Sequence, residues 1–172
     1  MIKRIFKRFK KFLTLKIHGI NYYLRKQGAT VGDNCYLYSD LSTTETYLIS
    51  IGDNTTVSND VQFITHDNSV CKVIEGATDV FGKITVGRNV FIGAHSILMP
   101  GVTIPDNTII AAGSVVVKSP QESGLIIGGN PARTIGNIND YKERMRDYAI
   151  NIEGLSAKEK KKLICSSKLL EK

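Results

Sequence analysis

The chain is poor in the residues that build disulfide frameworks and metal centres. It has three cysteines, Cys35, Cys71 and Cys165, an odd number spread far apart and without the paired spacing of zinc ligands. Ordinary thiols, no disulfide framework and no metal site are therefore expected.

The first 26 residues lack acidic side chains, and they contain no uninterrupted apolar run of signal-peptide or membrane-spanning length. They hold nine of the 23 Lys and Arg residues, so the rest of the chain has fourteen basic against sixteen acidic residues, a net charge of minus two. Apolar residues recur in this leader at spacings of three and four: Ile2, Ile5, Phe6, Phe9, Phe12, Leu13, Ile17 and Ile20. The pattern predicts a basic amphipathic helix over residues 1–27.

Two roles remain open for this helix. It can lie on an anionic membrane surface, or it can pack on the rest of the protein, as a cap or against a neighbouring subunit. Nucleic acid is not an expected partner, because the remainder of the chain is slightly acidic and offers no basic stripe. We expect a cytoplasmic protein, located at the inner face of the membrane if the leader binds lipid.

A six-residue unit repeats without a break from residue 86 to residue 117. Its first position is always aliphatic: Val86, Ile92, Leu98, Ile104, Ile110 and Val116. A period of six fits neither a helix nor a flat half-buried strand. The fifth position holds Val, Ser or Thr, and Gly, Asn, Asp and Pro supply corners. Each unit is thus predicted to be a short strand plus a corner, stacked on its neighbours around an aliphatic column.

The repeat also occurs upstream, at Val31, Leu37, Ile51, Val57 and Phe63. The step from Leu37 to Ile51 is two residues longer than two units, and residues 69–82 show no register, which predicts an excursion loop. A single repeat domain is therefore expected over residues 28–136. Residues 137–172 are predicted to form a helical extension, with helical spacing over 137–152 and a Ser-x-x-Glu capping box at Ser156 and Glu159.

Three segments resemble the hexapeptide-repeat acyltransferases, and among them the sugar O-acetyltransferases of the galactoside and surface-polysaccharide type. They are the repeat itself, VQFITHDNS at 61–69 and IIGGNPARTI at 126–135. The resemblance implies a mainly β fold, a left-handed parallel β-helix of triangular section. It also implies a homotrimer whose clefts lie between adjacent subunits, with acetyl-CoA as the co-substrate.

Acyl transfer to a hydroxyl requires a base, and a neutral imidazole suits that task near pH 7. Of the three histidines, His18 lies in the leader and His95 at a corner of the repeat, whereas His66 directly precedes the excursion loop. His66 matches the catalytic segment of the family and is the predicted base. Asp67 is a candidate for orienting an imidazole, and the resemblance places His95 near the coenzyme cleft.

The coenzyme requires small residues where its chain approaches the backbone, and cations for its phosphates. The resemblance implies an oxyanion donor at the Ala94 amide and a pantetheine contact at the Ala112 amide, with Gly113 beside it. It also assigns Lys118 and Arg133 to the phosphates.

The predicted function is transfer of an acetyl group from acetyl-CoA to a hydroxyl of a sugar or surface polysaccharide. The transfer is direct, with His66 as general base. Amino-sugar N-acetylation and serine O-acetylation are alternatives, and a non-catalytic trimeric scaffold is an alternative of another class. A gamma-class carbonic anhydrase is a further alternative that the sequence disfavours, because it needs three histidine ligands, two of them five residues apart, and no such pair occurs; metal analysis of the purified protein tests it.

Overall fold

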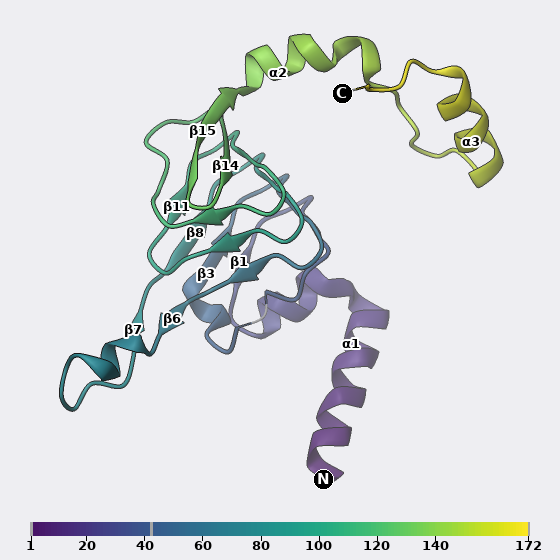
Figure 1. The fold of residues 1–172 in the computed structure, drawn as a ribbon. Helices are drawn as coiled ribbons and strands as arrows, with labels where there is room; N and C mark the ends of the chain where they lie inside the picture. Colours follow the sequence, from purple (N-terminus) through teal and green to yellow (C-terminus); the bar gives the residue numbers. More distant parts are fainter. Residues whose placement is uncertain (1, 42, 172) are drawn as a thin grey trace.

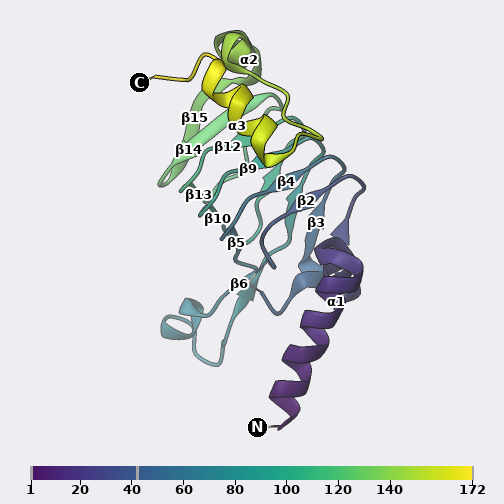
Figure 2. The same cartoon turned by 90° about the vertical axis from the view of Figure 1, so that its right-hand side faces the viewer.

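In the computed structural model, which describes the backbone of residues 2–41 and 43–171 and side chains from residue 13 onward, short strands stack into a coil with three faces (Figures 1 and 2). Sheet A contains β1 (Thr30–Val31), β3 (Ile49–Ile51), β8 (Ile84–Val86) and β11 (Thr103–Ile104). Sheet B contains β2 (Tyr36–Leu37), β4 (Thr56–Val57), β9 (Phe91–Ile92), β12 (Ile109–Ile110), β14 (Leu125–Gly129) and β15 (Ala132–Asn137). Sheet C contains β5 (Gln62–Phe63), β10 (Ile97–Leu98) and β13 (Val115–Val116).

Within each face the strands pair in parallel with the strand one coil away, for example Ile97 with Gln62 below and with Val115 above. The predicted aliphatic column is confirmed, since Val86, Ile92, Leu98, Ile104, Ile110 and Val116 are all buried. The small residues at the fifth position of each six-residue unit are buried with them. Ser96 and Ser114 satisfy their hydroxyls there by donating to the carbonyl oxygen of Ala111. The period of six thus reflects one inward-facing strand residue per face.

Corner residues fit the backbone that a sharp turn requires. The asparagines at the turns from sheet A to sheet B have positive φ, a conformation that this residue tolerates: Asn34, Asn54, Asn89 and Asn107. We name the other two turns by their sheets. The B–C corner, residues 58–61, 93–96 and 111–114, precedes the strands of sheet C, and the C–A corner, residues 64–68, 99–102 and 117–120, follows them.

The excursion leaves the coil at the C–A corner, after β5. It begins with β6 (His66–Asp67), which pairs antiparallel with β7 (Val80–Phe81), and it contains the 3-10 turn η2 (Ser69–Lys72). The expected loop is therefore a hairpin whose base is hydrogen-bonded, and it projects sideways from the lower coil (Figure 1). This ladder was missed because only two residues on each side form it, too few for a visible alternation.

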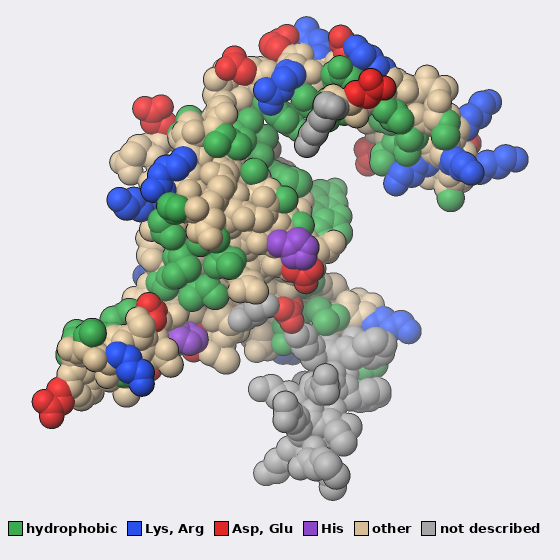
Figure 3. All heavy atoms as spheres, in the orientation of Figure 1, with side chains coloured by type: hydrophobic (Ala, Val, Ile, Leu, Met, Phe, Trp, Pro, Cys, Tyr) green, Lys and Arg blue, Asp and Glu red, His purple; other side chains and the backbone are tan. Residues whose placement is uncertain are grey.

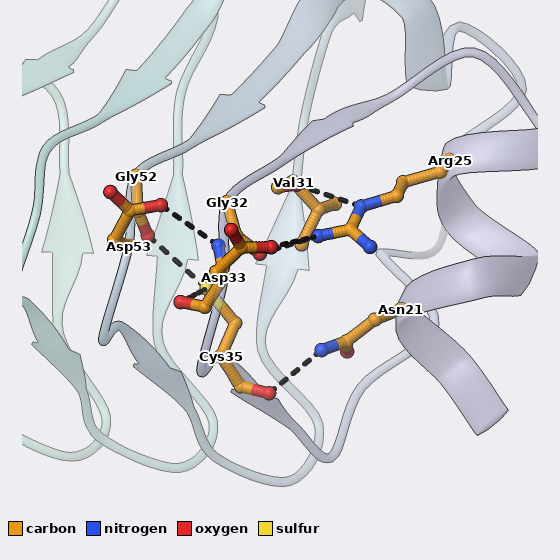
Figure 4. Close-up of polar contacts among 8 residues, drawn as sticks. All are labelled: Asn21, Arg25, Val31, Gly32, Asp33, Cys35, Gly52 and Asp53. Atoms are coloured by element: carbon orange, nitrogen blue, oxygen red, sulfur yellow. Dashed lines mark hydrogen bonds and ion pairs between the residues drawn. The ribbon is translucent and has the colours of Figure 1, made fainter.

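The N-terminal helix α1 (Ile2–Lys26) is broken at Gly19, whose backbone angles are not helical. The part after Gly19 covers the lower end of the coil. Leu24 is fully buried there. Arg25 donates to the carbonyl oxygens of Val31 and Gly32 at 2.8 and 2.7 Å, and Asn21 donates to that of Cys35 at 2.8 Å (Figure 4). Of the two roles left open by the sequence, packing as a cap is thus observed for this part of the helix.

At the upper end, β14 pairs antiparallel with β15, and helices follow. They are α2 (Ile138–Met145), the 3-10 turn η3 (Arg146–Tyr148) and α3 (Ala157–Ser166), which arch away from the coil in Figure 1. The helical pattern expected to residue 152 ends earlier, because Ala149 is extended. The predicted capping box of Ser156 and Glu159 is present. In the part of the chain described, no helix is long and apolar enough to cross a membrane.

Candidate active site

His66 stands at the C–A corner, where β6 begins, with 44% of its side chain exposed. Its Nδ1 lies 2.9 Å from Oε2 of Glu45, whose side chain is 16% exposed. Glu45 comes from the irregular segment between Leu37 and Ile51, just before the 3-10 turn η1 (Thr46–Leu48). The two extra residues that break the repeat there therefore belong to a segment that brings a carboxylate to the imidazole.

Threonine hydroxyls surround this carboxylate. Thr65 donates to Oε2 at 2.9 Å, Thr43 donates to it at 3.1 Å, and Thr44 donates to Oε1. The hydrogen bond from Thr44, followed by those from His66, Thr65 and Thr43, lowers the pKa of Glu45 to about 2 against the opposing effect of burial. An ionised carboxylate only accepts hydrogen bonds, so Nδ1 of His66 is the donor. In the neutral ring, Nε2 then carries the free lone pair that a general base needs.

The lowered pKa of Glu45 predicts a pH-dependent stability. The pKa of about 2 in the folded protein lies below the ordinary glutamate pKa of 4.5, so the contribution is present above about pH 4.5 and is lost as the pH falls toward 2. We expect Glu45→Gln to lower the melting temperature at neutral pH, and the difference from wild type to shrink between pH 4.5 and pH 3. Thermal unfolding followed by circular dichroism measures this. Glu75→Gln, at an exposed position on the excursion, is the matched control and should show no such trend.

Asp67, the sequence candidate for orienting an imidazole, has another partner. Its Oδ1 accepts the backbone N–H of Ser69 at 2.8 Å, and this hydrogen bond is the main cause that lowers the pKa of Asp67. The carboxylate on His66 is that of Glu45. Phe81, opposite His66 in the β6–β7 ladder, has its ring centre 5.9 Å from that of the imidazole and is largely exposed. An apolar ring face therefore lies beside the predicted base.

The B–C corner holds the small residues predicted for the coenzyme. Ala94 and Ala112 line a hollow of about 640 Å³ bounded by sheet B, β15 and α2, including Tyr141 and Arg144. Gly113 adjoins it, but its N–H already donates to the carbonyl oxygen of Ala94 at 2.8 Å. A Cβ at Gly93 would fall 2.4 Å from the amide nitrogen of Ala112, so successive coils are in close contact here. The hollow therefore presents the main chain to a ligand with little side chain between them.

His95 occupies the same corner with a positive φ of 59°. Its ring is largely exposed and lies 3.8 Å from a carboxylate oxygen of Asp60, one coil below. His95 therefore lies on a different corner of the coil from His66, and its place near the coenzyme cleft stays a prediction.

The predicted phosphate-binding cations lie together. Lys118 and Arg133 are both exposed and line a second hollow of about 540 Å³ at the top of the C–A corner. The backbone N–H of Ile64 donates to the carbonyl oxygen of Leu98, and the N–H of Met99 donates to the carbonyl oxygen of Val116. These bonds stack three successive coils at the C–A corner, so Lys118 stands on the same corner as His66 and two coils above it. With strands about 4.8 Å apart, that is roughly 10 Å along the coil.

Within one chain the predicted residues do not converge on a single site. The strands of sheet C are parallel, so Ala94 and Ala112, which precede them, stand at one edge of that sheet. His66 and Lys118, which follow them, stand at the opposite edge. Sequence reasoning missed Glu45. The stacked six-residue units define a hexapeptide-repeat protein, and a carboxylate-bound histidine and exposed cations lie on the corners of its coil.

Comparisons with known proteins agree with this class. The family model described as bacterial transferase hexapeptide (six repeats) matches residues 83–118. Protein CapG of Staphylococcus aureus is 42% identical over 143 residues, covering 80% of this chain and 83% of that protein. Galactoside O-acetyltransferase of Escherichia coli strain K12 is 32% identical over 132 residues, 75% of this chain and 64% of that protein. A solved galactoside acetyltransferase in complex with coenzyme A has a TM-score of 0.61 at 26% identity, covering 80% of this chain and 77% of that one. The chain therefore belongs to the hexapeptide-repeat acetyltransferases, with sugar O-acetyltransferases among its relatives.

Proposed function

We propose that the protein transfers an acetyl group from acetyl-CoA to a hydroxyl of a sugar or surface polysaccharide. Nε2 of His66 takes the hydroxyl proton as the acceptor oxygen attacks the thioester carbonyl. The bond from carbon to sulfur then breaks, and the proton that His66 took passes to the sulfur, so the coenzyme leaves as its thiol and the imidazole is neutral again. Glu45 acts as a positioning residue that holds the ring through Nδ1. Membership of the family also leads us to infer that the coil is left-handed.

The observation that carries this proposal is the order of the predicted residues along the coil. His66 follows β5, and Ala94 precedes β10, one coil higher. Ala112 precedes β13, and Lys118 follows it, another coil higher. This is the order in which an extended coenzyme requires a base at its thioester, backbone donors along its pantetheine arm and cations at its phosphates. The galactoside acetyltransferase neighbour holds coenzyme A, which supports acetyl-CoA as the co-substrate.

A second subunit completes such a site. If the subunits are related by rotation about an axis parallel to the coil, equivalent residues stay at the same height along that axis, so the C–A corner of one chain can face the B–C corner of the next. These two corners flank sheet C. In this arrangement sheet C therefore faces the rotation axis. The outer side of sheet C and its C–A edge carry the apolar residues Ile97, Val115 and Val117, and Val117 is 42% exposed. Hydrophobic side chains gather on that side of the coil, above the excursion, in Figure 3. We propose a homotrimer with three equivalent clefts.

The sugar acceptor is supported by the surroundings of His66. Phe81 places an aromatic ring beside the base, and the apolar face of a pyranose ring packs well on such a surface. A galactoside O-acetyltransferase is among the relatives.

Thiol release from acetyl-CoA, followed across a panel of sugars, amino sugars, serine and capsule-type oligosaccharides, tests the function. We expect release that depends on a hydroxylated sugar. Release only with an amino sugar or with serine would replace the acceptor in this proposal and keep the reaction. Failure to bind acetyl-CoA, measured by calorimetry, would overturn the proposal in favour of a non-catalytic scaffold.

A further inference from the structure

The leader divides at Gly19 into two parts with different surroundings. In the part after Gly19, Arg25 and Asn21 donate hydrogen bonds to the first coil (Figure 4). Leu24 is buried in the core of the coil, and Ile20 and Tyr23 pack against that core. The space around Gly19 is open, because a Cβ built on this residue would have no atom within 4 Å. We call residues 2–18, which precede the break, the basic arm.

The basic arm runs away from the coil as a helix (Figures 1 and 2). Its last turns, where side chains are described, expose apolar surface to solvent: Leu13 is 39% exposed and Ile17 is 68% exposed. The hydrogen bonds from Asn21 and Arg25 and the burial of Leu24, which make the cap, all come from residues after Gly19, so the cap does not account for the exposure of Leu13 and Ile17.

Charge is concentrated in the arm. It holds seven of the nine Lys and Arg residues of the leader and no acid, whereas residues 27–172 have a net charge of minus two. Its apolar residues recur at intervals of three and four, the sequence pattern of a helix with one apolar face, and three of them are phenylalanines. Basic residues combined with an apolar, aromatic face match the headgroup boundary of an anionic bilayer.

We propose that the basic arm binds the surface of an anionic membrane while the cap keeps the coil attached to it. The arm leaves from the lower end of the coil, beside β1, and His66 follows β5, the lowest strand of sheet C (Figure 1). Membrane attachment through the arm therefore brings the end of the coil that carries His66 toward the bilayer. An acceptor sugar carried on a lipid is presented at that end. The binding step itself is independent of the proposed acetyl transfer.

Vesicle co-sedimentation with the full chain tests this proposal. The probes are phosphatidylcholine vesicles with and without phosphatidylglycerol. The arm variant carries four Lys→Glu changes, at Lys3, Lys7, Lys10 and Lys11. The matched control carries the same number of Lys→Glu changes on the exposed surface of α3, at Lys158, Lys160, Lys161 and Lys162. Both variants have the same net charge, so only the place of the charge differs.

We expect wild type to sediment with the phosphatidylglycerol vesicles and to be released by salt. The arm variant should bind at least about 10-fold more weakly, whereas the α3 variant should stay within about 2-fold of wild type. His66→Ala should bind vesicles like wild type, which separates this test from that of the acetyltransferase activity. Equal loss in both charge variants, or no preference of wild type for phosphatidylglycerol, would overturn the proposal. So would an arm variant that keeps full vesicle binding or one whose only defect is a changed oligomeric state.

Discussion

Replacing His66 by alanine is expected to lower kcat for acetyl transfer by about 100-fold to 10,000-fold, the range that a lost general base produces. Among the described residues, Nε2 of His66 carries the only imidazole lone pair at the C–A corner, since His95 lies on the B–C corner and His18 lies on α1. Thiol release under saturating acetyl-CoA and acceptor measures kcat directly. Binding of the coenzyme should change little, because His66 is predicted to contact the acceptor hydroxyl.

His95→Ala is the matched control for this loss. It removes the same type of ring from an exposed position, and it should lower kcat far less than His66→Ala does. Glu45→Gln should lower kcat by about 10-fold or more without weakening coenzyme binding, because an amide can also donate to Nδ1 of His66 and so no longer fixes Nδ1 as the donor. A His66→Ala enzyme with near wild-type kcat and intact folding would refute the assigned base.

Mixed oligomers are expected to regain activity that neither parent variant has. The first parent is His66→Ala, which lacks the base. The second is Ala112→Trp, whose side chain should block the B–C hollow from an exposed position. A cleft between chains needs His66 from one and an intact Ala112 from its neighbour. In a trimer that contains both variants, one of the three clefts meets both conditions, so about a third of wild-type activity should return.

The mixture is prepared by co-expression with two affinity tags and purified over both, and native mass spectrometry gives its composition. Wild type mixed with His66→Ala calibrates the assay, because about half of its clefts should then be active. Activity that stays at the level of the separate parents, in verified mixed trimers, would show that each site lies within one chain.

The repeat determines its coil so directly that the sequence alone predicts it. Val86, Ile92 and Leu98 are buried because each fills the narrow interior at the same point of its unit, and this requirement repeats with every turn. The capping box at Ser156 was predictable for a similar reason, since its hydrogen bonds join residues three apart. Local or strictly periodic requirements leave a readable pattern.

The contacts of the site leave no such pattern. Glu45 and His66 are 21 residues apart and meet only because the coil turns once between them. The extra residues between Leu37 and Ile51 signalled that this coil departs from the repeat, but they could not indicate which side chain the departure positions. Asp67, the other candidate, is the immediate sequence neighbour of His66, and such a neighbour seldom orients the adjacent side chain. Its backbone geometry instead directs the carboxylate to the N–H of Ser69.

The pairing of β3 with β8 and of β5 with β10 joins coils on either side of the excursion without using its residues. The register of the scaffold is therefore fixed independently of residues 68–79, and lengthening such a loop costs little, since doubling its length adds about 0.6 kcal/mol of closure entropy. The hairpin tip can vary in length and sequence while the base ladder keeps His66 in place. It is the natural segment to exchange when redirecting this transferase to a different acceptor.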